Sequence, residues 1–140
     1  MIQKNQREEI ISLIKREVVP AIGCTEPVAV ALCVAKATEL LGTLPQQIDV
    51  ALSSNVLKNA MGVGIPGTGM IGLPIAIALG ATIGKSEYQL EVLKDVCPEA
   101  VEEGKKYIDS GAIKISLNEN APSKLHIEVT AINGIESAKA

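Results

Sequence analysis

A cysteine placed directly before an expected helix start has the clearest chemical potential in this sequence. Cys24 stands in a Gly-Cys-Thr segment, and Thr25-Glu26-Pro27 then supplies an N-cap residue, an acid and a proline suited to a first turn. The dipole and free backbone N–H groups of a helix N-terminus stabilise a thiolate, the form that binds metal or attacks an electrophile. We therefore expect Cys24 to be functional.

The other two cysteines have plainer interpretations. Cys33 lies nine residues beyond Cys24 on the same expected helix, roughly 13 Å away by helical rise, which is too far for two ligands of one cluster. We interpret Cys33 as a core residue, the usual role of a free cysteine. Cys97 precedes Pro98 at an expected helix start, and we interpret it as structural.

A second group of polar residues precedes a glycine-rich stretch. The group contains Ser53, Asn55, Lys58 and Asn59, and the stretch runs from Gly64 to Gly69. Donor side chains, one of them cationic, beside a backbone that a ligand can approach closely would suit a carboxylate or a phosphate. The alternative is a turn-rich surface loop, and the residues alone leave both interpretations open.

The only histidine offers little support for nucleophilic catalysis. His126 falls on the polar face of an expected strand beside Glu128, where an exposed strand residue is the simplest interpretation. We therefore do not expect a Cys-His or Ser-His-Asp mechanism.

Three motifs together resemble the N-terminal part of the L-cysteine desulfidase family. They are Pro20-Ala-Ile-Gly-Cys-Thr-Glu-Pro27, Ser53-x-Asn55-x-x-Lys58-Asn59 and Gly62-Val-Gly-Ile-Pro-Gly-Thr-Gly69. This family is related to the alpha chain of iron-sulfur L-serine dehydratases and includes many uncharacterised bacterial members. The resemblance extends from Pro20 to about Leu93.

The resemblance implies a chemistry and a cofactor. It implies β-elimination from L-cysteine or L-serine, giving pyruvate, ammonia and sulfide or water. It also makes Cys24 one ligand of a [4Fe-4S] cluster whose remaining ligands are expected outside this chain, because similar family members are much longer. The chain is then expected to be an N-terminal fragment that is inactive without the missing C-terminal portion.

We assign roles to the motif residues on that basis. Lys58 is the α-proton base or the clamp for the substrate carboxylate, and Ser53, Asn55 and Asn59 complete the catalytic group. The substrate-binding residues are Thr25, Glu26, Gly67, Thr68 and Gly69. Two alternatives remain: a non-catalytic module that binds a small anion or serves a structural role, and a metal-free enzyme that uses the Cys24 thiolate.

Helical periodicity and capping signals predict the helices that position these residues. A proline, glycine or capping residue marks most of the boundaries. The expected helices span residues 5–19, from Thr25-Glu26-Pro27 to Leu41 before Gly42, 73–83, 87–93 and 98 to about 111. The first half of the second helix has no polar face and should be buried all round.

Alternating apolar residues predict the strands, at 47–53, 113–117 and 125–130. Asn133-Gly134 favours a type I′ turn, so a last strand should return over 135–140. Residues 54–72 are too rich in Gly, Asn and Pro for regular structure and are expected to form a long functional loop. The order predicts an α+β fold, with N-terminal helices around an apolar core, a Gly-rich loop after one strand and a C-terminal antiparallel strand meander.

The length and composition of the chain limit the classes of partner that it is expected to bind. With 140 residues and 47% apolar residues, a single domain over 1–140 is expected. A net charge of −3 and the absence of Trp and Phe argue against nucleic acid, and a polar N-terminus without an apolar signal segment suggests the cytoplasm. The uncharged stretch 59–84 is too interrupted by Gly and Pro for a membrane span. We expect a small amino-acid substrate; the unprotected edge of the last strand leaves a homo-oligomer open.

Overall fold

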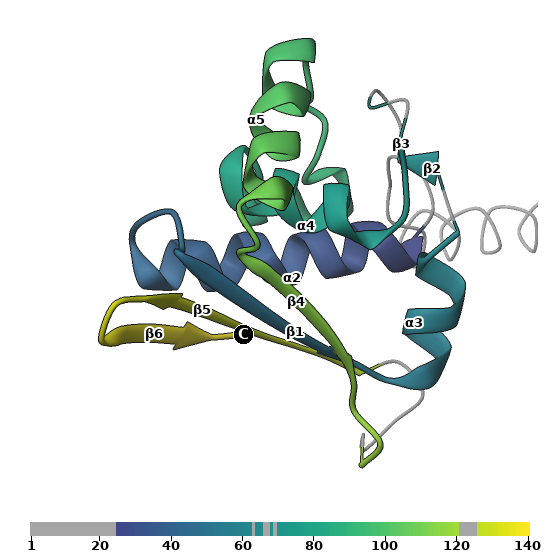
Figure 1. The fold of residues 1–140 in the computed structure, drawn as a ribbon. Coiled ribbons are helices and arrows are strands. Elements are labelled where there is room, and N and C mark those ends of the chain that lie inside the picture. The colour runs from purple at the N-terminus through teal and green to yellow at the C-terminus, as the bar shows by residue number, and fades with distance from the viewer. Residues whose placement is uncertain (1–24, 63, 66–67, 69, 121–125) are drawn as a thin grey trace, which may run out of the picture.

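The computed structural model describes residues 25–62, 64–65, 68, 70–120 and 126–140. The predicted helix over 5–19 and the residue Cys24 lie outside these residues. The described chain is α+β, as predicted: helices α2, α4 and α5 lie on one side of a four-stranded sheet (Figure 1).

Helix α2 spans Thr25–Leu41 and is the long helix next to the sheet. None of the residues from Val28 to Ala35 is exposed, but Ala29, Leu32 and Cys33 are only half-buried. Their spacing of three and four residues places them on one face, so the first half of the helix is largely buried rather than buried all round. The helix ends as predicted at Gly42, whose φ of +85° suits a residue without a Cβ and whose N–H donates to the Thr38 carbonyl at 2.9 Å.

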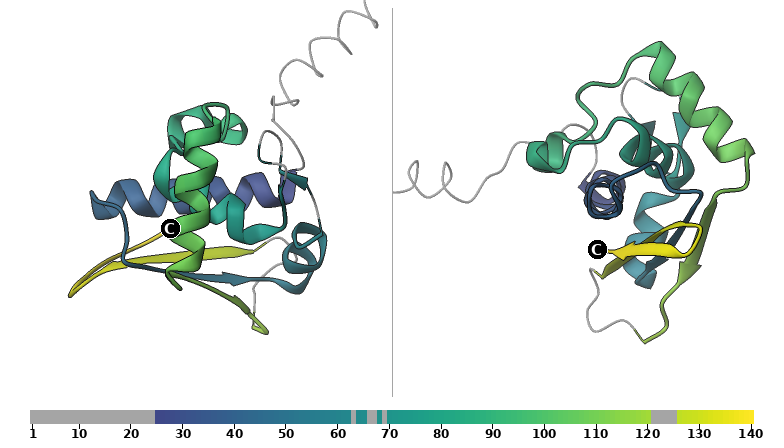
Figure 2. Two further views of the ribbon diagram at one scale, coloured as in Figure 1. Left: turned by 45° about the horizontal axis from the view of Figure 1, so that its top comes forward. Right: turned by 90° about the vertical axis from the view of Figure 1, so that its left-hand side faces the viewer.

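Helices α4 (Leu73–Thr82) and α5 (Pro98–Asp109) follow the predicted spans closely. Helix α4 is buried against α2 on one side and α5 on the other (Figure 2). The helices α2 and α4 touch at their backbones, because a Cβ added to Gly80 would lie 2.6 Å from the Ala31 carbonyl oxygen. The short helix predicted between them and α5 is a 3-10 helix, η1 (Ser86–Glu91), whose first N–H donates to the Glu39 carboxylate on α2 at 2.8 Å.

The main sheet has the strand order β4-β1-β5-β6. Its strands are β1 (Gln47–Leu52), β4 (Ile113–Leu117), β5 (Ile127–Asn133) and β6 (Glu136–Lys139). Strands β5 and β6 form the expected antiparallel hairpin, whereas β1 lies between β4 and β5, parallel to the first and antiparallel to the second. The C-terminal strands therefore do not follow one another across the sheet, since β1 supplies the central position.

The turn between β5 and β6 differs from the predicted one by one residue. The pair Asn133 and Glu136 closes it, so that Gly134 and Ile135 are its central residues. Only Gly134 has a positive φ, +65°, at the first central position, as in a type II′ turn rather than the predicted type I′.

The prediction of irregular structure throughout residues 54–72 is wrong for three segments. Helix α3 spans Ser54–Ala60, and β2 (Gly64–Ile65) pairs antiparallel with β3 (Met70–Ile71). The helix forms because Val56 and Ala60, four residues apart, bury one face against the core while polar residues take the other.

Candidate functional site

Ser53 joins the end of β1 to the start of β5. Its side chain is only 3% exposed, and its hydroxyl accepts the backbone N–H of His126 at 3.2 Å. Its own backbone N–H donates to the His126 carbonyl at 3.0 Å. Ser53 occupies the N-cap position of α3 but its side chain makes no capping bond. It therefore fixes the point where the chain leaves the sheet and enters α3.

The other predicted catalytic residues form one face of α3. Asn55, Lys58 and Asn59 are all exposed, and their spacing of three and four residues places them on the same side of the helix. Lys58 lies in the last turn, where a cation interacts favourably with the helix dipole. The structure thus brings three of the four predicted catalytic side chains together on a solvent-facing surface.

The glycine-rich stretch after α3 includes a small antiparallel hairpin. Within it, Thr68 donates its hydroxyl to the Ile65 carbonyl at 2.7 Å, and its backbone N–H reaches the same oxygen at 3.2 Å. At its end, Gly72 has a φ of +90°, and a Cβ there would lie 2.9 Å from the Met61 carbonyl oxygen. A glycine is therefore required where the hairpin returns to the end of α3.

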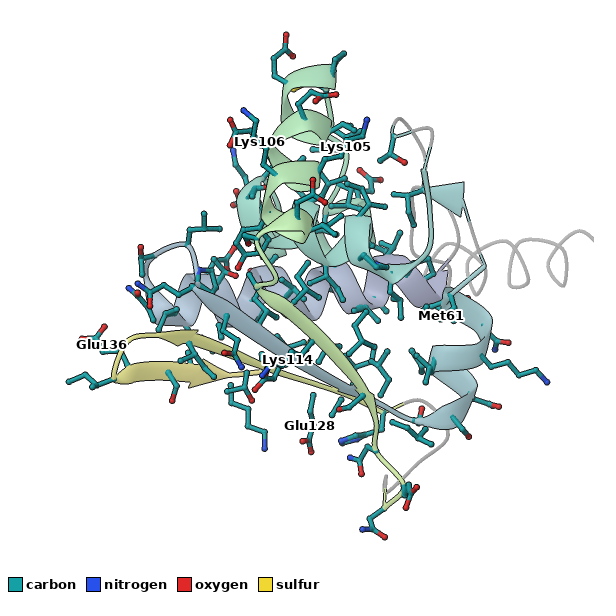
Figure 3. All side chains as sticks on the ribbon, viewed as in Figure 1. Met61, Lys105, Lys106, Lys114, Glu128 and Glu136 are labelled. Carbon is teal, nitrogen blue, oxygen red and sulfur yellow. The ribbon has the colours of Figure 1, made fainter. Side chains whose placement is uncertain are left out.

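The described parts of the three motifs meet at one end of the molecule. The N-terminal end of α2, the end of α3 marked by Met61, and the β2–β3 pair lie together there in two orientations (Figures 1–3). Thr25 is the first residue of α2, and the half-buried Glu26 lies in its first turn. Gly67 and Gly69, like Cys24, are outside the described residues, so their predicted roles stay predictions.

The two described cysteines do not form a ligand set. Cys33 is half-buried against the main core, as predicted, and burial raises the pKa of its thiol to about 11. Cys97 is exposed at the N-cap of α5, the predicted helix start. Across the described ranges no three His, Cys, Asp or Glu side chains gather as metal ligands would. The described residues therefore do not by themselves fit an iron-sulfur cluster.

His126 is more constrained than its sequence context suggested. Its side chain is half-buried, and Nε2 lies 2.9 Å from Glu128 Oε1, while Glu128 Oε2 lies 3.4 Å from Lys139 Nζ. The hydrogen bond from His126, and then the charge of Lys139, lower the pKa of the Glu128 carboxyl. The sequence predicted an exposed strand residue beside Glu128, whereas His126 is half-buried, directly precedes β5 and bonds to Glu128. No local signal could have shown the bonds to Ser53, which is 73 residues away.

No helix in the described ranges combines the length and apolar character that a bilayer crossing requires.

The chain is similar to curated proteins named UPF0597 protein. The one from Phocaeicola vulgatus is 75% identical over 129 residues, which make up 92% of this chain and 30% of that protein. One from Bacteroides fragilis is 71% identical over 137 residues, or 98% of this chain and 32% of the relative. One from Aeromonas hydrophila is 51% identical over 128 residues, or 91% of this chain and 29% of the relative.

This chain therefore spans about 30% of the length of the relatives it matches. Their shared name states no activity, substrate or cofactor. No family model matches the chain, and no solved structure matches it.

Proposed function

We propose that this chain forms part of a β-eliminating lyase that converts L-cysteine or L-serine to pyruvate, ammonia and sulfide or water. The observation that carries the proposal is the exposed face of α3, where Asn55, Lys58 and Asn59 lie at the same end of the molecule as the start of α2. The resemblance of all three motifs to the L-cysteine desulfidase family supplies the reaction.

In this proposal Lys58 acts directly on the substrate. As an ammonium it would bind the carboxylate, and as a neutral amine it would take the α-proton. The side-chain amides of Asn55 and Asn59 carry both donors and acceptors, so they would orient the carboxylate and the amino group. Loss of the α-proton is followed by cleavage of the bond to the β-substituent, which leaves as sulfide or water. The resulting enamine hydrolyses to pyruvate and ammonia.

The proposed cofactor is a [4Fe-4S] cluster with Cys24 as one ligand and the other ligands in parts of the longer protein outside this chain. A cluster with one open iron would supply a Lewis acid for the leaving group. The roles of Lys58, Asn55 and Asn59 can be tested without assuming the position of the cluster.

The test uses a chimera in which this chain replaces the matching segment of the Phocaeicola vulgatus relative, reconstituted anaerobically with iron and sulfide. Pyruvate release is measured from L-cysteine and from L-serine. Lys58→Ala should lower kcat/KM by about 100-fold or more, the usual scale for a general base. A fall in kcat would identify the base, and a rise in KM alone would identify the carboxylate clamp.

Lys106→Ala is a matched control, because Lys106 is also an exposed lysine in the last turn of a helix. It should leave both constants unchanged. Unchanged turnover and affinity in Lys58→Ala would remove both proposed roles of Lys58. Binding of a small carboxylate without turnover, surviving Cys24→Ser, would instead support an anion-binding module.

A further inference from the structure

The two edges of the main sheet differ in character. Strand β6 forms one edge. This edge was expected to be unprotected, but it has the exposed charged residues Glu136 and Lys139, a common protection against pairing with other chains. Strand β4 forms the other edge and lies at the outer margin of the sheet (Figure 2, right). In the part of the chain that the structure describes, no strand pairs with its outer side.

The apolar side of β4 is incompletely covered. On the neighbouring strand β1, the residues that face the core are at most 1% exposed. Ile113 and Ile115 are only half-buried, and Leu117, opposite the fully buried Leu52, is 46% exposed. An apolar strip of three residues therefore follows the outer strand and becomes more exposed toward its end.

The same three residues direct their backbone groups outward. The Ile48 N–H donates to the Ala112 carbonyl at 2.7 Å, and the Asn118 N–H donates to the Leu52 carbonyl at 2.7 Å. Because strand backbone groups alternate in direction, the even-numbered residues from 112 to 118 bond to β1. The N–H and C=O groups of Ile113, Ile115 and Leu117 then point away from the sheet.

We propose that this edge binds a second copy of the chain, with the two β4 strands antiparallel and a two-fold axis at Ile115. Each Ile113 then lies opposite Leu117 of the second copy, and the two Ile115 residues face each other. Each of the three residues with outward-facing backbone groups then lies opposite such a residue of the second copy. Their N–H and C=O groups can form a ladder of about six backbone hydrogen bonds. The two apolar strips join on the core-facing side of one continuous eight-stranded sheet.

The charge pattern selects this register. An axis at Ile115 places Lys114 opposite Ser116 of the second copy, so no like charges meet. An axis at Lys114 would set two lysines directly opposite, which is destabilising. An axis at Ser116 would leave Ile113 unpaired. An axis between two residues would place backbone groups that point outward opposite backbone groups that point toward β1, so that they could not bond. A second copy therefore fits this edge in one full-length register.

The test is sedimentation equilibrium of the 140-residue chain from about 5 µM to 1 mM, since a single-strand interface is small and is expected to be weak. Ser116 is exposed. In the proposed dimer, Ser116 of each copy lies opposite Lys114 of the other copy, which makes two such pairs. Ser116→Lys should raise the dimer Kd about five-fold, and Ser116→Glu should lower it about five-fold, from two charge pairs of about 0.5 kcal/mol each. Ser137→Lys, at an exposed position on β6, should leave Kd unchanged.

Amide hydrogen exchange gives an independent readout that does not depend on any variant. The N–H groups of Ile113, Ile115 and Leu117 should exchange more slowly as the protein concentration rises, whereas those of Lys114 and Ser116 already bond to β1 and should not change. A chain that stays monomeric up to 1 mM would overturn the proposal. A dimer whose Kd responds alike to Ser116→Lys and Ser116→Glu, or responds to Ser137→Lys, would also overturn it.

Discussion

At the residue scale, Ser53 shows how one side chain fixes the position of several others. Its hydroxyl is used in holding the backbone of His126 rather than in capping α3. The two bonds between Ser53 and His126 determine where α3 leaves the sheet and therefore where Lys58 is presented. Ser53, which its motif assigns to catalysis, therefore also positions the other residues of that motif.

We expect Ser53→Ala to lower the free energy of unfolding by about 1–2 kcal/mol, because the His126 N–H loses an acceptor in a buried setting. Urea unfolding followed by circular dichroism measures the change. Ser54→Ala, at the exposed neighbouring position, should stay within about 0.5 kcal/mol of the parent. Equal stability of Ser53→Ala and the parent would mean that the two backbone segments hold together without this hydroxyl.

At the element scale, the close contact of α2 and α4 is what allows both helices to lie near the sheet. Residues of both belong to the core cluster that also contains the inner residues of β1 and β5. The contact depends on Gly80, since any side chain there would meet the backbone of Ala31 rather than a side chain that could move aside. Close packing of backbones leaves no room for a methyl group.

Gly80→Ala should therefore destabilise the fold by about 1–3 kcal/mol through overpacking, despite the better helix propensity of alanine. Gly104→Ala is the matched comparison, because a Cβ there would meet side chains alone: the tip of Ile75 at 3.0 Å, and Ala78 and Leu79 at an ordinary contact distance of 3.6 Å. Thermal unfolding of both variants should rank Gly80→Ala clearly lower. The reverse order would show that the interface between α2 and α4 can open at little cost.

Most helices and strands were predictable because their signals are local. The apolar run of α4 and the alternation in β4 and β5 each lie within a dozen residues. Helix α3 was missed because it is only seven residues long and its single signal, Val56 and Ala60 four residues apart, is surrounded by Gly and Asn. The central place of β1 could not be predicted, since it depends on which distant strands pair with it.

The candidate site, like the fold, was predictable from the sequence only where its signals are local. The spacing of Asn55, Lys58 and Asn59 already places them on one face once a helix is assumed. The bonds of Ser53 to His126 join residues 73 positions apart, and no sequence pattern marks them. Local spacing therefore identified the polar group, while its anchoring required the folded chain.

At the scale of the whole molecule, two ionisable side chains lie between the helices and the sheet. Cys33 on α2 packs against the core beside β5, and burial raises its pKa from 9.0 to about 11. Tyr107 on α5 donates its hydroxyl to the Pro45 carbonyl at 2.6 Å, and burial raises its pKa from 10.0 to about 12. Both groups keep their protons in the folded chain at pH values where the unfolded chain loses them.

The folded chain should therefore lose stability as the pH rises from about 9 toward 11, because deprotonation of Cys33 favours the unfolded state. Urea unfolding at intervals across this range measures the slope. Cys33→Ala should make the slope shallower, while Cys97→Ala, at an exposed cysteine, should leave it unchanged. An identical slope in Cys33→Ala would assign the alkaline sensitivity to other groups.

The central position of β1 also constrains how the protein is made in the cell. Its partner in β4 is synthesised about 65 residues later, and its partner in β5 later still. At roughly 5–20 residues per second, the ribosome needs several seconds to supply them. During that interval Ile48, Val50 and Leu52 form an unpaired apolar segment on a nascent chain, the kind of segment that chaperones bind. The four-stranded sheet can be completed only after translation has passed residue 139, the end of β6.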